Sequence, residues 1–169
     1  MILWHLATAL FGFRWVFRDP DADLRWLMVG ALAPDILDVP IGTLVYSSSE
    51  VFAHSLSVVM AVGTAVLVST DRRGPMRRNL MVMTAGWLIH LLADGIWLEP
   101  AVLWWPFAGW SFPAEATPFW PAAWERAGSD VWRWVAEGLG LLYLGWLWRI
   151  TGLGSPEVRR RFLVTGQLS

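Results

Sequence analysis

Long apolar runs alternate with short polar turns along this chain, and the pattern predicts an all-α integral membrane bundle of four to five helices. A helix needs about 20 apolar residues to cross a bilayer. Four of the runs approach that length, and the first is slightly short. The expected helical segments are Ile2–Phe17, Trp26–Tyr46, Phe52–Thr70, Asn79–Leu98 and Val131–Ile150. Because no internal repeat is evident, we expect a single membrane-embedded domain over residues 1–169.

Two prolines interrupt the second apolar run. Pro34 and Pro40 each lack a backbone donor and disfavour helix at the preceding residue, which predicts a broken segment. Asp35 and Asp38 lie between them. Broken backbone at membrane depth is tolerated where it lines a cavity or is covered by protein, and an acid at that depth indicates function. Capping of a helix by Asp35 remains the alternative.

A second polar pair lies in the fourth run, within GWLIHLLADGIW. His90 and Asp94 are four residues apart, so both lie on one helical face, one turn from each other. Their apolar surroundings cannot solvate them, and a buried polar group needs a partner. A metal ion and a mutually bonded pair in a helix bundle are both compatible with this pattern.

The polar residues of the apolar runs are expected at a similar depth. The Arg72–Arg78 loop and the arginines of a basic tail, 154–169, should be cytoplasmic by the positive-inside rule. Alternating spans then bring every histidine and the acids near them into the extracytoplasmic half. This argues for one shared site facing the extracytoplasmic side of a prokaryotic cytoplasmic membrane. Its candidate metal ligands are His5, Asp35, Asp38, His54, His90 and Asp94.

Some of these residues also have simpler explanations. His5 could be an interfacial residue near the terminus, and His54, followed by Ser55, could belong to a polar turn at a helix start. Six groups exceed one tetrahedral shell, so either two ions share a bridging carboxylate, or one aspartate is a base or supports a ligand.

Composition narrows the chemistry. The chain is 56% hydrophobic and 16% charged, and its net charge of −1 implies no nucleic-acid partner. It has no cysteine, which excludes disulfides, thiolate ligands and cysteine nucleophiles. Any metal is therefore bound by histidine and carboxylate. These donors suit one or two divalent ions, Zn²⁺ first, with Mn²⁺ or Fe²⁺ as alternatives.

The segment 99–130 is rich in tryptophan and proline and has no clear period, so we expect an extracytoplasmic loop. Eight of the fourteen tryptophans lie between Trp97 and Trp134. They form either an aromatic belt at the interface or a rim that admits lipid head groups to the site. In the last run, Arg133 and Glu137 have the spacing of a structural ion pair. Three glycines there favour close helix packing: Gly138, Gly140 and Gly145.

The motifs GALAPDILDVPIG, FAHSL and HLLADGIW together resemble the bacterial and archaeal family of membrane-bound metal-dependent hydrolases. The resemblance covers about Gly30 to Phe107, with His5 in addition. That family is in turn similar to zinc-dependent phospholipase C. By this resemblance the zinc ligands are His5, Asp38, His54, His90 and Asp94, with Asp94 as a bridge, and Asp35 is a base or supporting group. The chain departs from the phospholipase because no histidine follows His90.

The expected function is therefore metal-dependent hydrolysis of an ester or phosphoester in a lipid or other envelope substrate. A metal-activated water would attack, and Asp35 or Asp38 would accept its proton. Membrane lipids are the expected partners. The rival functions are a proton or metal-ion transporter and a non-catalytic protein with a structural metal site. A transporter would need polar residues in the cytoplasmic halves of its spans, and the sequence offers none comparable there.

Overall fold

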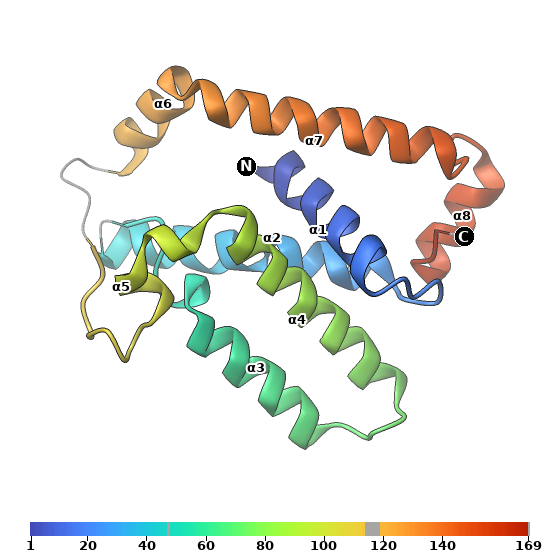
Figure 1. Cartoon of the computed structure of the whole chain (residues 1–169), viewed down its shortest axis with the longest axis horizontal. Coiled ribbons are helices and arrows are strands. Elements are labelled where there is room, and N and C mark those ends of the chain that lie inside the picture. The colour runs from blue at the N-terminus through green and yellow to red at the C-terminus, as the bar shows by residue number, and fades with distance from the viewer. Residues whose placement is uncertain (47, 114–118, 169) are drawn as a thin grey trace.

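Helices form the regular structure of this protein, as the apolar pattern predicts (Figure 1). The computed structural model describes residues 1–46, 48–113 and 119–168. The longer helices are α1 (Ile2–Val16), α2 (Leu24–Ile41), α3 (Leu56–Ser69), α4 (Pro75–Ala93) and α7 (Val131–Ile150). The shorter elements are η1 (Gly42–Tyr46), η2 (Phe52–His54), η3 (Ile96–Leu98), α5 (Pro100–Leu103), α6 (Phe119–Ser129) and α8 (Pro156–Thr165).

The sequence predicted a break inside the second apolar run, and the structure places it at a different position. Helix α2 begins after its cap Asp23, which accepts a hydrogen bond from the Arg25 backbone N–H, and continues through Pro34 and Pro40. A proline removes one helical hydrogen bond, and here the packing of α2 along α4 holds the helix together. The irregularity comes just after Pro40, where the π-helical turn η1 follows.

Two glycines let α2 and α4 cross in direct backbone contact. A Cβ atom on Gly30 would overlap the carbonyl oxygen of Met83, and one on Gly86 would overlap that of Leu27. The two contacts are reciprocal, so only glycine fits at either position. This crossing is the centre of the fold, and it brings the last turn of α4 against the middle of α2.

Helix α1 lies between the α2–α4 pair and α7 (Figure 1). Gly140 of α7 faces the α1 backbone so closely that a Cβ would overlap Leu3. Glu137 accepts a hydrogen bond from the Leu3 N–H at 3.0 Å. Of the three glycines expected to permit close packing, Gly140 does so within the chain. At Gly138 and Gly145, by contrast, an added Cβ would meet no described atom within 4 Å.

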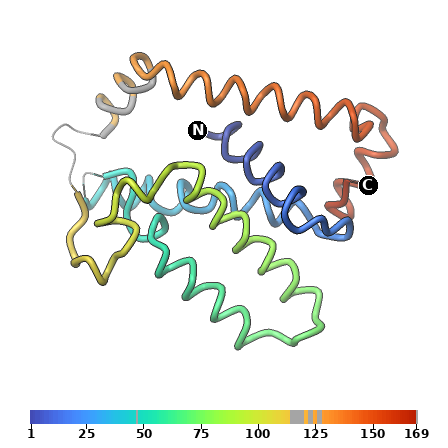
Figure 2. The backbone as a smooth tube through the Cα atoms, in the orientation of Figure 1, coloured from blue at the N-terminus to red at the C-terminus, as the bar shows by residue number. Residues whose placement is uncertain are grey.

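The arginine-rich turns meet at one end of the molecule. Arg78 of α4 pairs with Asp19 in the α1–α2 turn at 2.9 Å, and Arg25 of α2 donates to the carbonyl of Leu163 in α8. Figure 2 shows the C-terminal end of the chain beside the α1–α2 turn. The starts of α1 and α3 and the end of α4 lie away from these turns, so the molecule has a basic end and a second, different end.

Among the described residues, one helical segment is long and apolar enough to cross a membrane. It is Leu24–Tyr46, of 23 residues. Helices α1 and α3 are apolar but have 15 and 14 residues, about 20 Å at 1.5 Å per residue. Many large apolar side chains are exposed on α1, α2, α3 and α7. Segment 99–130, which showed no clear period in the sequence, contains the helices α5 and α6.

Candidate metal centre

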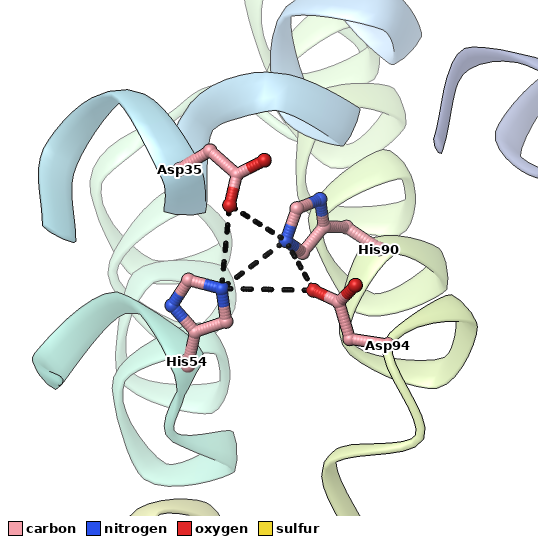
Figure 3. A group of neighbouring side chains, drawn as sticks. All are labelled: Asp35, His54, His90 and Asp94. Carbon is pink, nitrogen blue, oxygen red and sulfur yellow. Dashed lines mark hydrogen bonds and ion pairs between the residues drawn. The ribbon is translucent and has the colours of Figure 1, made fainter. Parts of the chain in front are cut away.

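Four side-chain atoms from three parts of the chain converge (Figure 3). They are Oδ1 of Asp35 in α2, Nε2 of His54 in η2, and Nε2 of His90 and Oδ2 of Asp94 at the end of α4. All lie within 4.8 Å of one another. The separations are 3.3 Å for His54–His90, 3.7 Å for His54–Asp35 and His54–Asp94, 3.8 Å for His90–Asp35 and 2.9 Å for His90–Asp94.

Five of the six separations among these atoms lie near the edge length of a metal coordination tetrahedron. With metal–ligand bonds of about 2.0–2.1 Å, tetrahedral ligand atoms lie about 3.3–3.4 Å apart. The five separations scatter on both sides of that value. Two imidazoles and two carboxylates are also donors that a divalent ion such as zinc accepts.

The outer nitrogens of the two central histidines fix their tautomers. His54 Nδ1 lies 2.7 Å from a carboxylate oxygen of Asp38, and His90 Nδ1 lies 2.7 Å from the Ala31 carbonyl oxygen. Both partners only accept hydrogen bonds, so each Nδ1 carries the hydrogen. In the neutral rings the two Nε2 lone pairs then face each other at 3.3 Å. Two lone pairs at that distance repel unless a proton or a metal ion lies between them.

Asp38 orients His54 instead of pointing into the four-atom set. Its carboxylate accepts backbone hydrogen bonds from Val51, Ala53 and His54 at 2.9–3.0 Å, in addition to the bond from the His54 ring. The side chain is 1% exposed. Both oxygens are therefore engaged by the η2 turn, which differs from the expectation that Asp38 is a ligand or a proton acceptor. Carboxylates in this position fix the orientation and basicity of a metal-binding histidine.

His5 lies on the other side of the two central carboxylates. Its Nε2 is 2.7 Å from Oδ1 of Asp94, and its Nδ1 is 3.7 Å from Oδ2 of Asp35. That Nδ1 is buried and has no hydrogen-bond partner among the described residues. Each carboxylate thus has one oxygen toward the histidine pair and the other toward His5. At 2.7 Å, His5 Nε2 and Asp94 Oδ1 are directly hydrogen-bonded.

Local structure explains these positions. Asp94 ends α4, and Gly95 follows in the left-handed conformation at φ 68°, so the chain turns away immediately after the His90–Asp94 turn. The Trp87 indole donates to the Ala53 carbonyl at 2.7 Å and ties α4 to η2. All three histidines are fully buried, while the Asp35 side chain is 34% exposed.

Asp35 opens into a cavity of about 510 Å³. Three lining residues with polar side chains were absent from the sequence-based site: Ser49, Glu50 and Arg133. Glu50 lies four residues before His54 in the turn after η1, and its polar surroundings there gave no specific signal. Burial raises the pKa of the Glu50 carboxyl group. The spacing of Arg133 with Glu137 suggested an ion pair, which does not form among the described residues, and Glu137 accepts a hydrogen bond from the Leu3 N–H.

Comparison with known proteins identifies a family. No curated protein and no solved structure matches the chain. The family model described as YdjM inner membrane protein matches residues 1–154, a range that includes every residue of the cluster and Arg133. This family is described as membrane-bound metal-dependent hydrolases. The buried histidines and aspartates, the apolar surface and the family match agree, and the chain belongs to the YdjM inner membrane protein family.

Proposed function

We propose that this protein is a membrane-bound metal-dependent hydrolase that cleaves an ester or phosphoester in a lipid or other envelope substrate. The observation that carries the proposal is the pair of Nε2 atoms of His54 and His90. They face each other at 3.3 Å while their hydrogens are held on the opposite nitrogens, and carboxylate oxygens of Asp35 and Asp94 complete the set.

Asp35, His54, His90 and Asp94 would hold the first divalent ion, for which zinc is the best match to the donors. His5 and the outer oxygens of Asp35 and Asp94 offer a smaller second set. When bound, such an ion supplies a nucleophile by lowering the pKa of water toward about 7, and it polarises the bond under attack.

Asp35 is the best-placed proton acceptor among the aspartates. Its side chain is the most exposed of the cluster, it lines the cavity, and its Oδ2 points toward His5 at 3.7 Å. Asp38 has no free oxygen and instead holds His54 in the tautomer that binds a cation. The two aspartates that the sequence treats alike therefore have different proposed roles.

The membrane orientation is part of this proposal. The basic end, which includes the α3–α4 loop and the 154–169 tail, would lie in the cytoplasm by the positive-inside rule. The cavity would then open near the extracytoplasmic interface, together with the Trp-rich segment 99–130. Substrates would enter from the outer leaflet or from the space beyond it.

Metal content is the direct test. The full chain, purified in detergent and incubated with zinc, should retain one or two equivalents after desalting, measured by plasma mass spectrometry. His90→Ala and Asp94→Ala should lose the metal, while Asp71→Asn, an exposed change at the basic end, should not. Absence of tightly bound zinc, manganese or iron in the wild type would rule out the proposed mechanism.

A second experiment separates catalysis from a structural role. Asp35→Asn removes a charge at the exposed edge of the cluster. A folded, metal-containing Asp35→Asn variant without hydrolysis supports a catalytic site. A wild type that holds metal but cleaves none of a panel of esters and phosphoesters indicates a structural metal.

A further inference from the structure

Arg133 is a cationic side chain at the wall of the cavity beside the candidate metal centre. It lines the same cavity as His5, Asp35 and Asp94. Its Nε atom is buried without a hydrogen bond, and the guanidinium has no ion pair within the described part of the chain. Buried polar atoms are almost always hydrogen-bonded, and an unpaired one is costly. Such an atom at the wall of a cavity points to a ligand that binds there.

The neighbours of Arg133 on its own helix are occupied. Glu137, one turn later, accepts the Leu3 N–H, and Asp130 caps α7 by accepting the backbone N–H groups of Trp132 and Arg133. The same contact of Glu137 with Leu3, together with Gly140, holds α7 on α1. The helix therefore keeps Arg133 at the cavity wall and leaves its side chain available.

We propose that Arg133 binds a phosphate group of the substrate, so that the hydrolase acts on phosphoesters and not on carboxylic esters. This rests on the proposed function. A guanidinium is a planar fork that matches the oxygens of a phosphate. A phosphoester carries negative charge at the reacting group, which Arg133 and a metal held by the cluster would bind from two directions. A neutral carboxylic ester gives the guanidinium no charge to pair with.

The surroundings of Arg133 fit a phosphate at the membrane surface. Trp132 and Trp134 flank it, and both are exposed. Tryptophans are enriched at the depth of lipid head groups, so Arg133 would lie where lipid phosphates are found. The acids on the cavity wall, Asp35, Glu50 and Asp94, would otherwise repel an anion, and Arg133 brings a cationic side chain to this wall that offsets them.

The test measures binding of inorganic phosphate to the zinc-loaded full chain by calorimetry, with free metal removed. Arg133→Gln should weaken phosphate binding by about 10–100-fold, the usual loss for hydrogen bonds to a charged group. Its zinc content should stay at the wild-type level. The matched control is Arg149→Gln, an exposed arginine in the last turn of the same helix, which should bind phosphate like the wild type. Equal phosphate affinity of Arg133→Gln and wild type would overturn the proposal.

Two further arms locate the source of the phosphate. Glycerol phosphate in solution and phosphatidic acid in nanodiscs carry the same group, so preference for one identifies a soluble or a lipid substrate.

If Arg133→Gln does not fold, as judged by its melting curve, Arg133→Lys replaces it. Lysine keeps the charge but loses the fork, so phosphate binding should weaken, and unchanged affinity contradicts the proposal. A wild-type protein that binds no zinc refutes the proposed hydrolase. If the wild type binds zinc but the Arg133 variants bind phosphate as tightly as the wild type does, only this inference is refuted.

Discussion

At the scale of single residues, Asp38 contributes most to the structure of the site. Its carboxylate gathers three backbone N–H groups and the His54 ring into one buried contact. It thereby joins the end of α2 to the start of α3 and aims Nε2 of His54 at the cluster. A residue of this kind affects both the stability of the fold and the affinity for metal.

We therefore expect Asp38→Ala to weaken zinc binding by about 10–100-fold, the effect typical of a residue that orients a ligand. It should also lower the melting temperature, because buried N–H groups lose their acceptor. Chelator competition measures the first effect and thermal unfolding in detergent the second. Asp21→Asn, in the exposed α1–α2 turn, is the control. Wild-type zinc affinity in Asp38→Ala would show that Asp38 does not orient His54.

Glu50 gives a prediction about pH. Burial raises the pKa of its carboxyl group in the folded protein, so the folded chain binds this proton more tightly than the unfolded chain. The resulting stabilisation is present at acid pH and is lost as the pH rises through the raised pKa. Glutamine cannot lose a proton. Metal-free Glu50→Gln should therefore gain melting temperature relative to wild type as the pH is raised from about 4 to neutrality. A difference that does not change with pH would contradict this.

The sequence predicted the participants of the site better than their roles. The spacing of His90 and Asp94 requires one helical face, and the structure places them there. The roles of Asp35 and Asp38 depend on which of them meets the η2 turn, more than ten residues later, and no local pattern contains that information. Arg133 was missed because its expected partner, Glu137, binds a backbone group of another helix.

At the scale of elements, the crossing of α2 and α4 sets the position of the site. It brings the Ala31 carbonyl to His90 and so fixes the histidine tautomer. The glycines at the crossing are required because backbone atoms occupy the space of any side chain. The crossing therefore connects helix packing directly to the geometry of the candidate metal centre.

Gly30→Ala should separate the two helices and destabilise the protein by about 1–3 kcal/mol, the usual cost of overpacking. It should also weaken zinc binding, since His90 loses its fixed partner. Gly138→Ala is the matched control, because nothing lies within 4 Å of its added carbon. Alanine is a better helix former by about 1 kcal/mol, so this control should be neutral or more stable. Equal melting curves and zinc affinities for Gly30→Ala and wild type would contradict the crossing.

The apolar pattern predicted the long helices, since each needs an apolar face, but it misjudged two other features. Pro34 and Pro40 suggested a break that the packing against α4 prevents. The segment 99–130 showed no period, yet it contains α5 and α6. Helix α5 has four residues, too few for a periodic pattern to stand out.

At the scale of the whole molecule, the basic turns lie at one end of the protein and the histidine–aspartate cluster lies at the other. The absence of cysteine makes this polarity easy to test, because any introduced cysteine is unique. In intact cells, a membrane-impermeant thiol reagent should label Ser111→Cys, in the Trp-rich segment, and should not label Asp71→Cys until the cells are opened. Both positions are exposed in the structure. The reverse labelling would place the cluster on the cytoplasmic side.

The packing contact between α1 and α7 constrains how related sequences can vary. Arg133 and Gly140 are seven residues apart, about two helical turns, so both face the same side of α7. Inserting or deleting one residue between them would turn Arg133 by about 100° while Gly140 stayed against Leu3. Relatives that use this arginine should therefore vary in length anywhere along the 99–130 segment, yet keep the seven-residue interval unchanged.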